Sequence, residues 1–266
     1  MIGGLLIVTA VIFDHSVLVL LNVLISFVCI CAIYELFTAI NINKLILITI
    51  PSLIFAGAYP LLSNVLLSQS LVYVYTLYMF IYILFFNKKI TLKEFMISYA
   101  MTLLITCSLK LFIDIRSSGG ELGSFYVILA MMLSWMPDTG AYFFGKIFGK
   151  NKLCEKISPK KTVEGAIGGV ILSIVSILLV CYLFKDFFFE SKNISVNYFL
   201  LVFMCVVASL ISILGDLSFS FIKRDYHIKD FSNVIPGHGG FLDRFDSVIF
   251  VVPFVYLVLN LFSVFN

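Results

Sequence analysis

The chain has 266 residues, of which 61% are apolar and only 12% charged, and its formal net charge is +3. Its mean hydropathy is +1.10, and a water-soluble domain of this size could not bury so much apolar surface. The apolar runs are too long for barrel strands and lack their alternation. The composition therefore excludes a soluble enzyme and predicts an all-α, polytopic integral membrane protein.

Hydrophobic stretches predict about nine transmembrane helices in a single membrane domain that covers residues 1–266. In chain order they span roughly 2–13, 17–38, 44–62, 70–86, 94–112, 121–137, 163–184, 196–215 and 247–265. The first is short for a span, but it lacks the basic start of a signal peptide, so we interpret it as a retained helix. The eighth is expected to continue beyond the hydrocarbon to about Lys223.

Lysine and arginine positions predict the orientation in the cell membrane. Most of the 18 basic residues fall in the connections after the second, fourth, sixth and eighth helices. The positive-inside rule places those connections and the N-terminus in the cytoplasm, and the C-terminus outside. A polar site is then expected to face the cytoplasm. Four acidic residues are interpreted as ordinary charges at the membrane interface: Glu35, Glu94, Asp114 and Glu121.

Carboxylates in a polar stretch between residues 215 and 247 are the first candidate functional groups. Asp216 lies at the inner end of the eighth predicted helix, and Asp243 and Asp246 lie at the entrance to the ninth. Three carboxylates from two antiparallel helices suit Mg²⁺, which prefers hard oxygen ligands and bridges to substrate phosphates. If the ninth helix begins there, Asp243 and Asp246 share one face. The alternatives are that Asp246 caps the helix and that Asp243 forms a salt bridge.

Basic residues and glycines in the same stretch favour phosphate binding. The basic residues are Lys223, Arg224, Lys229 and Arg244. Their side chains suit charge-assisted hydrogen bonds to phosphate oxygens. Gly239 and Gly240, next to His238, can turn backbone N–H groups toward an anion, and His238 either donates to a phosphate oxygen or belongs to a structural turn. Carboxylates for a divalent cation beside cations for phosphate predict an enzyme that handles a nucleoside triphosphate at a membrane.

Asp138 follows Pro137 at the end of the sixth predicted helix. Proline removes a backbone donor and favours a helix break, which would expose carbonyls and a carboxylate near the membrane face. Asp138 is then expected either to cap a second helix over Thr139–Phe148 or to belong to a nucleotide or metal site.

The segment before the seventh predicted helix combines capping residues with two lysines. Thr162 is expected to cap that helix, with Glu164 in its first turn. Lys160 and Lys161 are either topology signals or ligands of a phosphate. Three glycines have a spacing that permits close helix packing: Gly165, Gly168 and Gly169.

Three stretches together form a recognisable motif set. The longest reads Ser220-x-Ile222-Lys223-Arg224-x4-Lys229-Asp230-x-Ser232-x2-Ile235-Pro236-x-His238-Gly239-Gly240-Phe241-x-Asp243-Arg244-Phe245-Asp246. The others are Ser158–Gly169, with Val163 where an aromatic is commoner, and Asp138–Gly145. The set resembles the signature of the phosphatidate cytidylyltransferases (CDP-diacylglycerol synthases). The resemblance is specific from Pro137 to Ser247, so residues 116–266 are expected to form the catalytic part. Residues 1–115 match only in hydrophobic character and in Tyr34-Glu35.

The resemblance implies transfer of CMP from CTP to phosphatidate, with Mg²⁺ as cofactor, in a homodimer within the lipid membrane and without nucleic acid. The implied metal ligands are Asp216, Asp243 and Asp246. The implied catalytic set adds Lys223, Arg224 and Arg244. The implied substrate-binding residues are Asp138, Lys160, Lys161, Ser220, Lys229, His238, Gly239 and Gly240.

Two other functions fit part of the pattern. A polyprenol or dolichol kinase-like enzyme also uses CTP at a membrane, although the complete signature argues against it. An ion-coupled transporter also places carboxylates in a membrane domain. Acids and bases gathered at one face, not along the midplane, argue against transport.

Overall fold

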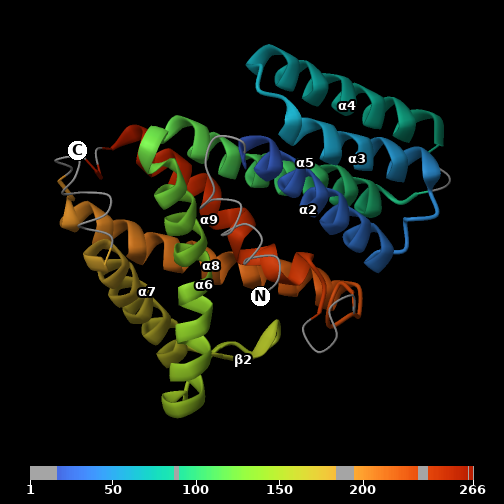
Figure 1. Ribbon diagram of the computed structural model, residues 1–266. Helices are drawn as coiled ribbons and strands as arrows, with labels where there is room; N and C mark the ends of the chain where they lie inside the picture. The colour runs from blue at the N-terminus through green and yellow to red at the C-terminus, as the bar shows by residue number, and fades with distance from the viewer. Residues whose placement is uncertain (1–16, 87–89, 184–194, 233–238, 263, 266) are drawn as a thin grey trace. The chain divides into compact units, whose positions relative to one another are not determined.

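The computed structural model describes residues 17–86, 90–183, 195–232, 239–262 and 264–265 (Figure 1). Over these residues the chain is mostly helical and forms two compact units. Unit 1 contains residues 1–113 and 226–245, and unit 2 contains residues 114–225 and 246–266. The predicted helix over residues 2–13 lies outside the described residues, as does His238.

Unit 1 is built from long apolar helices in sequence order. These are α2 (Val17–Ala39), α3 (Ile46–Ala58) with the short 3₁₀ helix η1 (Tyr59–Leu61), α4 (Val65–Phe86) and the first part of α5 (Leu92–Ser118). α3 packs against both α2 and α4. Glu94 and Thr91 form a capping box at the start of α5, because Glu94 Oε2 accepts from the Thr91 N–H and Thr91 Oγ1 accepts from the Glu94 N–H.

Unit 2 contains the remaining helices and one hairpin. After the 3₁₀ helix η2 (Gly120–Leu122) come α6 (Gly123–Phe148), strands β1 (Lys152–Cys154) and β2 (Ser158–Thr162), α7 (Val163–Leu183), α8 (Tyr198–Asp225) and α9 (Leu242–Leu261), of which the residues before Asp246 belong to unit 1. The strands pair antiparallel, with Lys152 opposite Thr162. α6, α7 and α8 pack against one another. The sequence missed the hairpin, since its charged, polar residues show no strand-like alternation of apolar positions.

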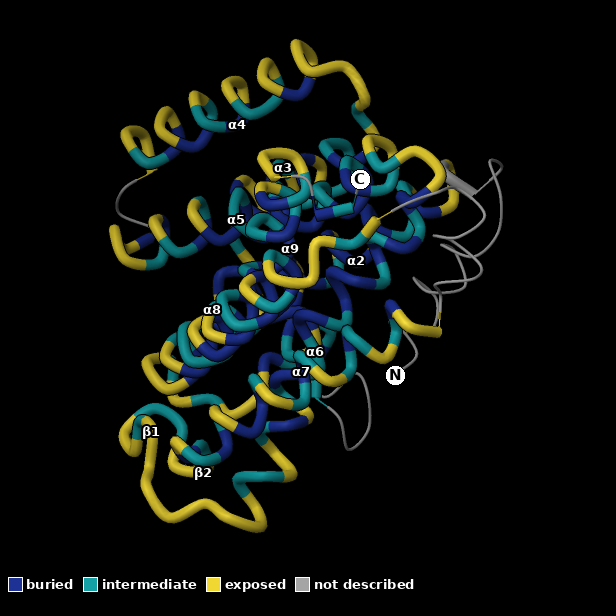
Figure 2. The backbone as a smooth tube through the Cα atoms, turned by 90° about the vertical axis from the view of Figure 1, so that its left-hand side faces the viewer, coloured by how far each residue is buried: buried dark blue, intermediate teal, exposed yellow. Residues whose placement is uncertain are grey.

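Six of the described helices are long and apolar enough to cross a membrane: α2, α4, α5, α6 with η2, α7 and α8. Large apolar side chains are exposed along them. Much of α4 is exposed (Figure 2). On this helix, for example, Leu84 is 74% and Phe85 78% exposed. Such surfaces are stable in contact with lipid but not with water. The protein is therefore a multi-pass membrane protein, as its hydropathy predicts.

The predicted helix break at Pro137 is wrong, because α6 continues through Pro137 to Phe148. Proline removes one backbone donor, and such a loss inside a helix is tolerated when neighbouring groups satisfy the freed carbonyls. The carbonyl that Pro137 leaves without its helical donor is that of Leu133. In the same turn, the hydroxyl of Ser212 on α8 donates to the Ser134 carbonyl oxygen at 3.1 Å, which ties this part of α6 to α8. Asp138 consequently lies inside a helix and caps none.

The close packing predicted for the glycines of α7 is confirmed. A Cβ added to Gly169 would lie 2.5 Å from the Pro137 carbonyl oxygen, and one added to Gly165 would lie 2.7 Å from that of Ala141. A Cβ added to Gly140 on α6 would lie 2.8 Å from Cα of Gly169. Only glycine allows two helix backbones to come this near. The contact fixes α6, and with it Asp138, against the start of α7.

Candidate active site

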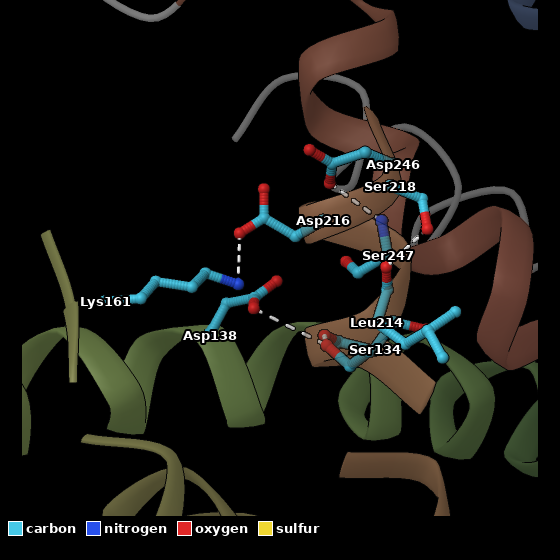
Figure 3. Close-up of polar contacts among 9 residues, drawn as sticks. Ser134, Asp138, Lys161, Leu214, Asp216, Ser218, Asp246 and Ser247 are labelled. Carbon is cyan, nitrogen blue, oxygen red and sulfur yellow. Dashed lines mark hydrogen bonds and ion pairs between the residues drawn. The ribbon is translucent and has the colours of Figure 1, made fainter. Parts of the chain in front are cut away.

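Three carboxylates from three helices of unit 2 lie close together: Asp138 on α6, Asp216 on α8 and Asp246 on α9 (Figure 3). Each is near enough to the other two to repel them electrostatically. Asp138 accepts a long hydrogen bond of 3.5 Å from the Ser212 hydroxyl. The convergence of Asp216 and Asp246 agrees with the expectation of a shared site, and Asp138 joins them from a helix that the sequence had ended just before it.

Lys161 is the basic partner of this cluster. Its ammonium group forms an ion pair with Asp216 and also attracts Asp138, and Figure 3 shows both carboxylates directed toward its end. Successive side chains of a strand point to opposite faces. In β2, Lys161 is half-buried and directed at the cluster, while its neighbour Lys160 is exposed. The sequence could not separate these adjacent lysines, because the hairpin was not predicted.

A close approach between α8 and α9 brings Asp216 beside Asp246. A Cβ added to Gly215 would lie 3.0 Å from the Asp246 carbonyl oxygen and 3.2 Å from Cα of Ser247. Contacts of 3.0–3.4 Å require a neighbour to shift, and here both neighbours are backbone atoms. Gly215 therefore sets the spacing between the two carboxylate-bearing helices.

Asp246 is the most deeply buried carboxylate of the cluster, with 7% of its surface exposed. Its Oδ1 accepts a hydrogen bond of 2.7 Å from the Ser247 N–H. Lys223 on α8, also 7% exposed, attracts it electrostatically. Because α9 begins at Leu242, Asp246 lies in the second turn and does not cap the helix.

The carboxylate oxygens of the cluster suit a divalent cation that prefers hard oxygen ligands. Asp138, Asp216 and Asp246 outnumber Lys161 and Lys223, so these five groups keep a net negative charge when all are ionised. Among the described residues, no three acidic, histidine or cysteine side chains are placed to coordinate one ion by themselves. Mg²⁺ commonly takes one or two carboxylates and completes its shell with water and substrate phosphates, which this arrangement fits.

Asp243 lies in unit 1 and accepts hydrogen bonds from backbone N–H groups. Its Oδ2 accepts hydrogen bonds from the N–H groups of Phe231, at 2.9 Å, and Gly240, at 3.0 Å. The carboxylate thus joins two described segments, residues 231–232 and 239–241, which are here together called the signature loop. Its predicted role as a metal ligand stays a prediction.

Glu35 is the functional candidate that the sequence misread. It is 4% exposed, so its interpretation as an ordinary interface charge is wrong. Its carboxylate accepts hydrogen bonds from the Ser232 hydroxyl and from the N–H groups of Phe241 and Leu242. The resemblance of Tyr34-Glu35 to the family pattern was the one available signal, and it carried no indication of these partners.

The remaining predicted residues differ in their surroundings. Ser220 is buried, with 8% of its surface exposed. The exposed ones are Lys160, Arg224, Lys229 and Arg244. Gly239 has a φ of +78°, a conformation that favours glycine. These basic residues therefore have side chains accessible to a ligand, and their substrate contacts stay predictions.

The fold and the site place the protein in a class of multi-pass helical membrane proteins that have an acidic cluster with a lysine ion-paired to it. Comparison with known families agrees. The sequence model described as the cytidylyltransferase family matches residues 1–262. The chain belongs to the cytidylyltransferase family, and the match extends through the N-terminal half that its motifs alone left weakly related.

Individual relatives are similar to a shorter part of the chain than the family model. A phosphatidate cytidylyltransferase of Bacillus subtilis is 43% identical over 152 residues, 57% of this chain and 53% of the relative. Enzymes of the same name from Staphylococcus haemolyticus and Staphylococcus saprophyticus are 43% and 44% identical over 137 residues, 52% of this chain and 50% of each relative. The matched part thus spans about half the length of these relatives.

Proposed function

We propose that the protein transfers CMP from CTP to phosphatidate, giving CDP-diacylglycerol and pyrophosphate. The observation that carries the proposal is the cluster of Asp138, Asp216 and Asp246 around Lys161. Asp138, Lys161 and Asp246 come from three different stretches of the family signature, and Asp216 lies shortly before the longest of them. The relatives named as phosphatidate cytidylyltransferases support the same substrate pair.

Asp216 and Asp246 are the proposed carboxylate ligands of Mg²⁺, with Asp138 beside them and Asp243 as a further predicted ligand. When bound, the ion would neutralise charge on the triphosphate and on the departing pyrophosphate. Asp246 is held for this role by burial and by the Ser247 N–H. Asp216 is held by Lys161 and by the short separation of α8 and α9 at Gly215.

The basic residues have the complementary role of binding phosphates. Lys161 and Lys223 lie beside the carboxylates and would share the negative charge of CTP and the lipid phosphate. Arg224, Lys229 and Arg244 are accessible for further contacts, in which arginine can bind two oxygens at once. The lipid phosphate, already a nucleophile near neutral pH, attacks the α-phosphorus of CTP in line, so the protein needs to orient it rather than deprotonate it.

A nine-span topology with a cytoplasmic N-terminus, an external C-terminus and a homodimeric assembly complete the proposal. The distribution of basic residues supports the orientation, because β1, β2 and the end of α8 are rich in lysine. A reporter within Lys146–Lys161 is expected inside the cell and one after Phe265 outside. A C-terminal reporter in the cytoplasm would contradict this topology.

The decisive experiment supplies purified protein with CTP, phosphatidate and Mg²⁺ in mixed micelles. We expect CDP-diacylglycerol and pyrophosphate in equal amounts, and neither product when phosphatidate or CTP is omitted. A kinase-like enzyme would instead release CDP and phosphorylate a lipid alcohol. An ion transporter would show no nucleotide dependence at all. Either result would reject the proposed reaction.

A further inference from the structure

Glu35 binds a loop that is far from it in the sequence. Its partners Phe241 and Leu242 lie 206 and 207 residues later in the chain. Oε1 accepts from the Ser232 hydroxyl at 2.6 Å and from the Phe241 N–H at 3.0 Å, and Oε2 accepts from the Leu242 N–H at 2.9 Å. All of these residues belong to unit 1. One buried carboxylate on α2 therefore holds both ends of the signature loop.

The hydrogen bonds require a carboxylate rather than any polar side chain. Both oxygens act as acceptors, and a carboxylate offers acceptors only. An amide at this position would have one oxygen and one NH₂ group, which would face a backbone N–H in either orientation. A buried N–H without an acceptor costs more than the bond itself contributes. Charge-assisted bonds to a carboxylate are also the stronger kind.

Gly240 shows how closely the loop fits around Glu35. A Cβ added there would lie 2.5 Å from Glu35 Oε2 and 2.7 Å from the Ser232 hydroxyl oxygen. The signature glycine is thus explained by its contact with Glu35, without any ligand. The edge-to-face contact of the Phe241 ring with Phe27, another residue of α2, holds the same part of the loop.

The start of α9 depends on these bonds. The first N–H groups of a helix have no partner within it, and a negative charge at this end is stabilised by the helix dipole. Glu35 accepts from Leu242, the first residue of α9, and from the residue before it. Asp246 follows Leu242 by four residues, about one turn of the same helix. The direction in which α9 begins therefore affects Asp246.

We propose that Glu35 is a positioning residue of the active site, which fixes the signature loop and the first turn of α9 through bonds that Ser232, Phe241 and Leu242 donate to it. This inference rests on the proposed cytidylyltransferase function for its catalytic consequence. Glu35 itself contacts no substrate. It acts through the backbone that carries Asp243, Arg244 and Asp246.

The test compares Glu35→Gln with Glu94→Gln. Both replace a carboxylate of unit 1 that accepts backbone N–H groups, but Glu94 only caps the start of α5. Hydrogen exchange, measured by mass spectrometry on peptides covering residues 239–245, reports the loop without requiring activity. In Glu35→Gln we expect exchange at Phe241 and Leu242 to accelerate about tenfold or more, since a charge-assisted bond of this kind is lost. Glu94→Gln should leave it unchanged.

Enzyme kinetics distinguish a positioning role of Glu35 from a loss of overall protein stability in the variant. A variant with a smaller folded fraction lowers the maximal rate but keeps the KM for CTP. We expect Glu35→Gln to raise that KM and to lower kcat/KM about ten- to a hundredfold, as loss of one charge-assisted interaction would. Glu35→Asp, which keeps both oxygens on a shorter stem, should fall between Glu35→Gln and wild type. Glu94→Gln should remain within about twofold of wild type.

Unchanged exchange in Glu35→Gln would overturn the proposal, and so would faster exchange with an unaltered KM and kcat/KM. If Glu35→Gln is not recovered in the membrane, Glu35→Asp carries both measurements with the same criteria. A wild-type protein without CTP-dependent reaction would reject the proposed function instead, and the exchange comparison would then decide whether Glu35 holds the loop.

Discussion

Two buried acidic regions of the protein differ in what surrounds their carboxylates. Glu35 in unit 1 is fully engaged by a hydroxyl and two backbone N–H groups. Asp138, Asp216 and Asp246 in unit 2 instead face one another, with Lys161 and Lys223 as nearby cations. Both regions contain residues of the family signature or contact it directly. Of these two regions, only the second contains carboxylates that repel one another.

The different surroundings of these carboxylates distinguish one with a structural role from one that can bind a cation. Burial of a charge is costly unless hydrogen bonds or an opposite charge compensate it. One hydroxyl and two backbone N–H groups compensate the charge of Glu35. Carboxylates brought together against their repulsion gain stability from an added cation. Substitutions in the two regions should therefore have effects of different size and kind.

The largest effect is expected for Asp246→Asn. Asparagine keeps the shape but removes a negative charge that the proposed Mg²⁺ site requires, so the rate of CDP-diacylglycerol formation should fall about a thousandfold or more. Protein level and membrane insertion should be unchanged. Asp225→Asn, an exposed change at the end of α8, is the matched control and should retain activity. A near-normal rate for Asp246→Asn at ordinary Mg²⁺ would remove the distinction between the two regions.

Combining Asp216→Asn with Asp246→Asn tests whether the two carboxylates of this cluster act together. Asp216→Asn alone should be nearly as severe as Asp246→Asn, because both carboxylates are proposed to serve one ion. The combined variant should then be little worse than either single one, since residues that act as a unit are strongly non-additive. Pyrophosphate release measured for the four proteins tests this. Losses that multiply would mean that the two carboxylates act separately.

An intermediate effect is expected for Lys161→Gln. The change removes the ion pair with Asp216 and one proposed phosphate contact, and should lower kcat/KM for CTP about ten- to a hundredfold. Lys156→Gln alters an exposed lysine in the turn between β1 and β2 and should leave the rate within about twofold. Equal activity of both variants would indicate that the hairpin lysines serve only orientation.

Gly169→Ala tests the packing beneath the cluster. The new Cβ would press against the Pro137 carbonyl oxygen, which cannot move without shifting α6, so stability should fall by about 1–3 kcal/mol. Gly57→Ala in α3 is the control, because its Cβ would meet only the flexible end of Ile30. Thermal inactivation of both proteins in the same detergent gives the comparison. Equal inactivation temperatures would show that the close contact of α6 and α7 is not required.

The smallest effect is expected for Ser232→Ala, in the region around Glu35. Glu35 loses its hydroxyl donor but keeps the N–H groups of Phe241 and Leu242, so the cost should be about 0.5–1.5 kcal/mol. Thermal inactivation should shift slightly and activity should fall by no more than about tenfold. A loss as large as that of Asp246→Asn would mean that the signature loop binds substrate through Ser232 itself.

Helix positions and helix packing were largely predictable from local sequence. Hydropathy located α2 through α8, although α4 begins five residues earlier and α5 ends six residues later than expected, and α6 continues past Pro137, where proline was given too much weight. Thr162 caps α7 as expected, since its Oγ1 accepts from the Gly165 N–H. Glu164 lies in the first turn of α7 as expected, and its carboxylate accepts from the N–H groups of Lys150 and Asn151, which directly precede β1.

The sequence by itself determined the membrane class, most of the described helices and the residues of the signature, because hydropathy and motif spacing are properties of neighbouring residues. Only the tertiary structure decided which of those residues meet. It placed Asp138 beside Asp216 and Asp246, separated Lys161 from Lys160, and assigned Asp243 and Glu35 to the signature loop. Such contacts depend on where glycines let helices approach and where a strand turns its side chains. Neither is encoded in the local pattern around a single carboxylate.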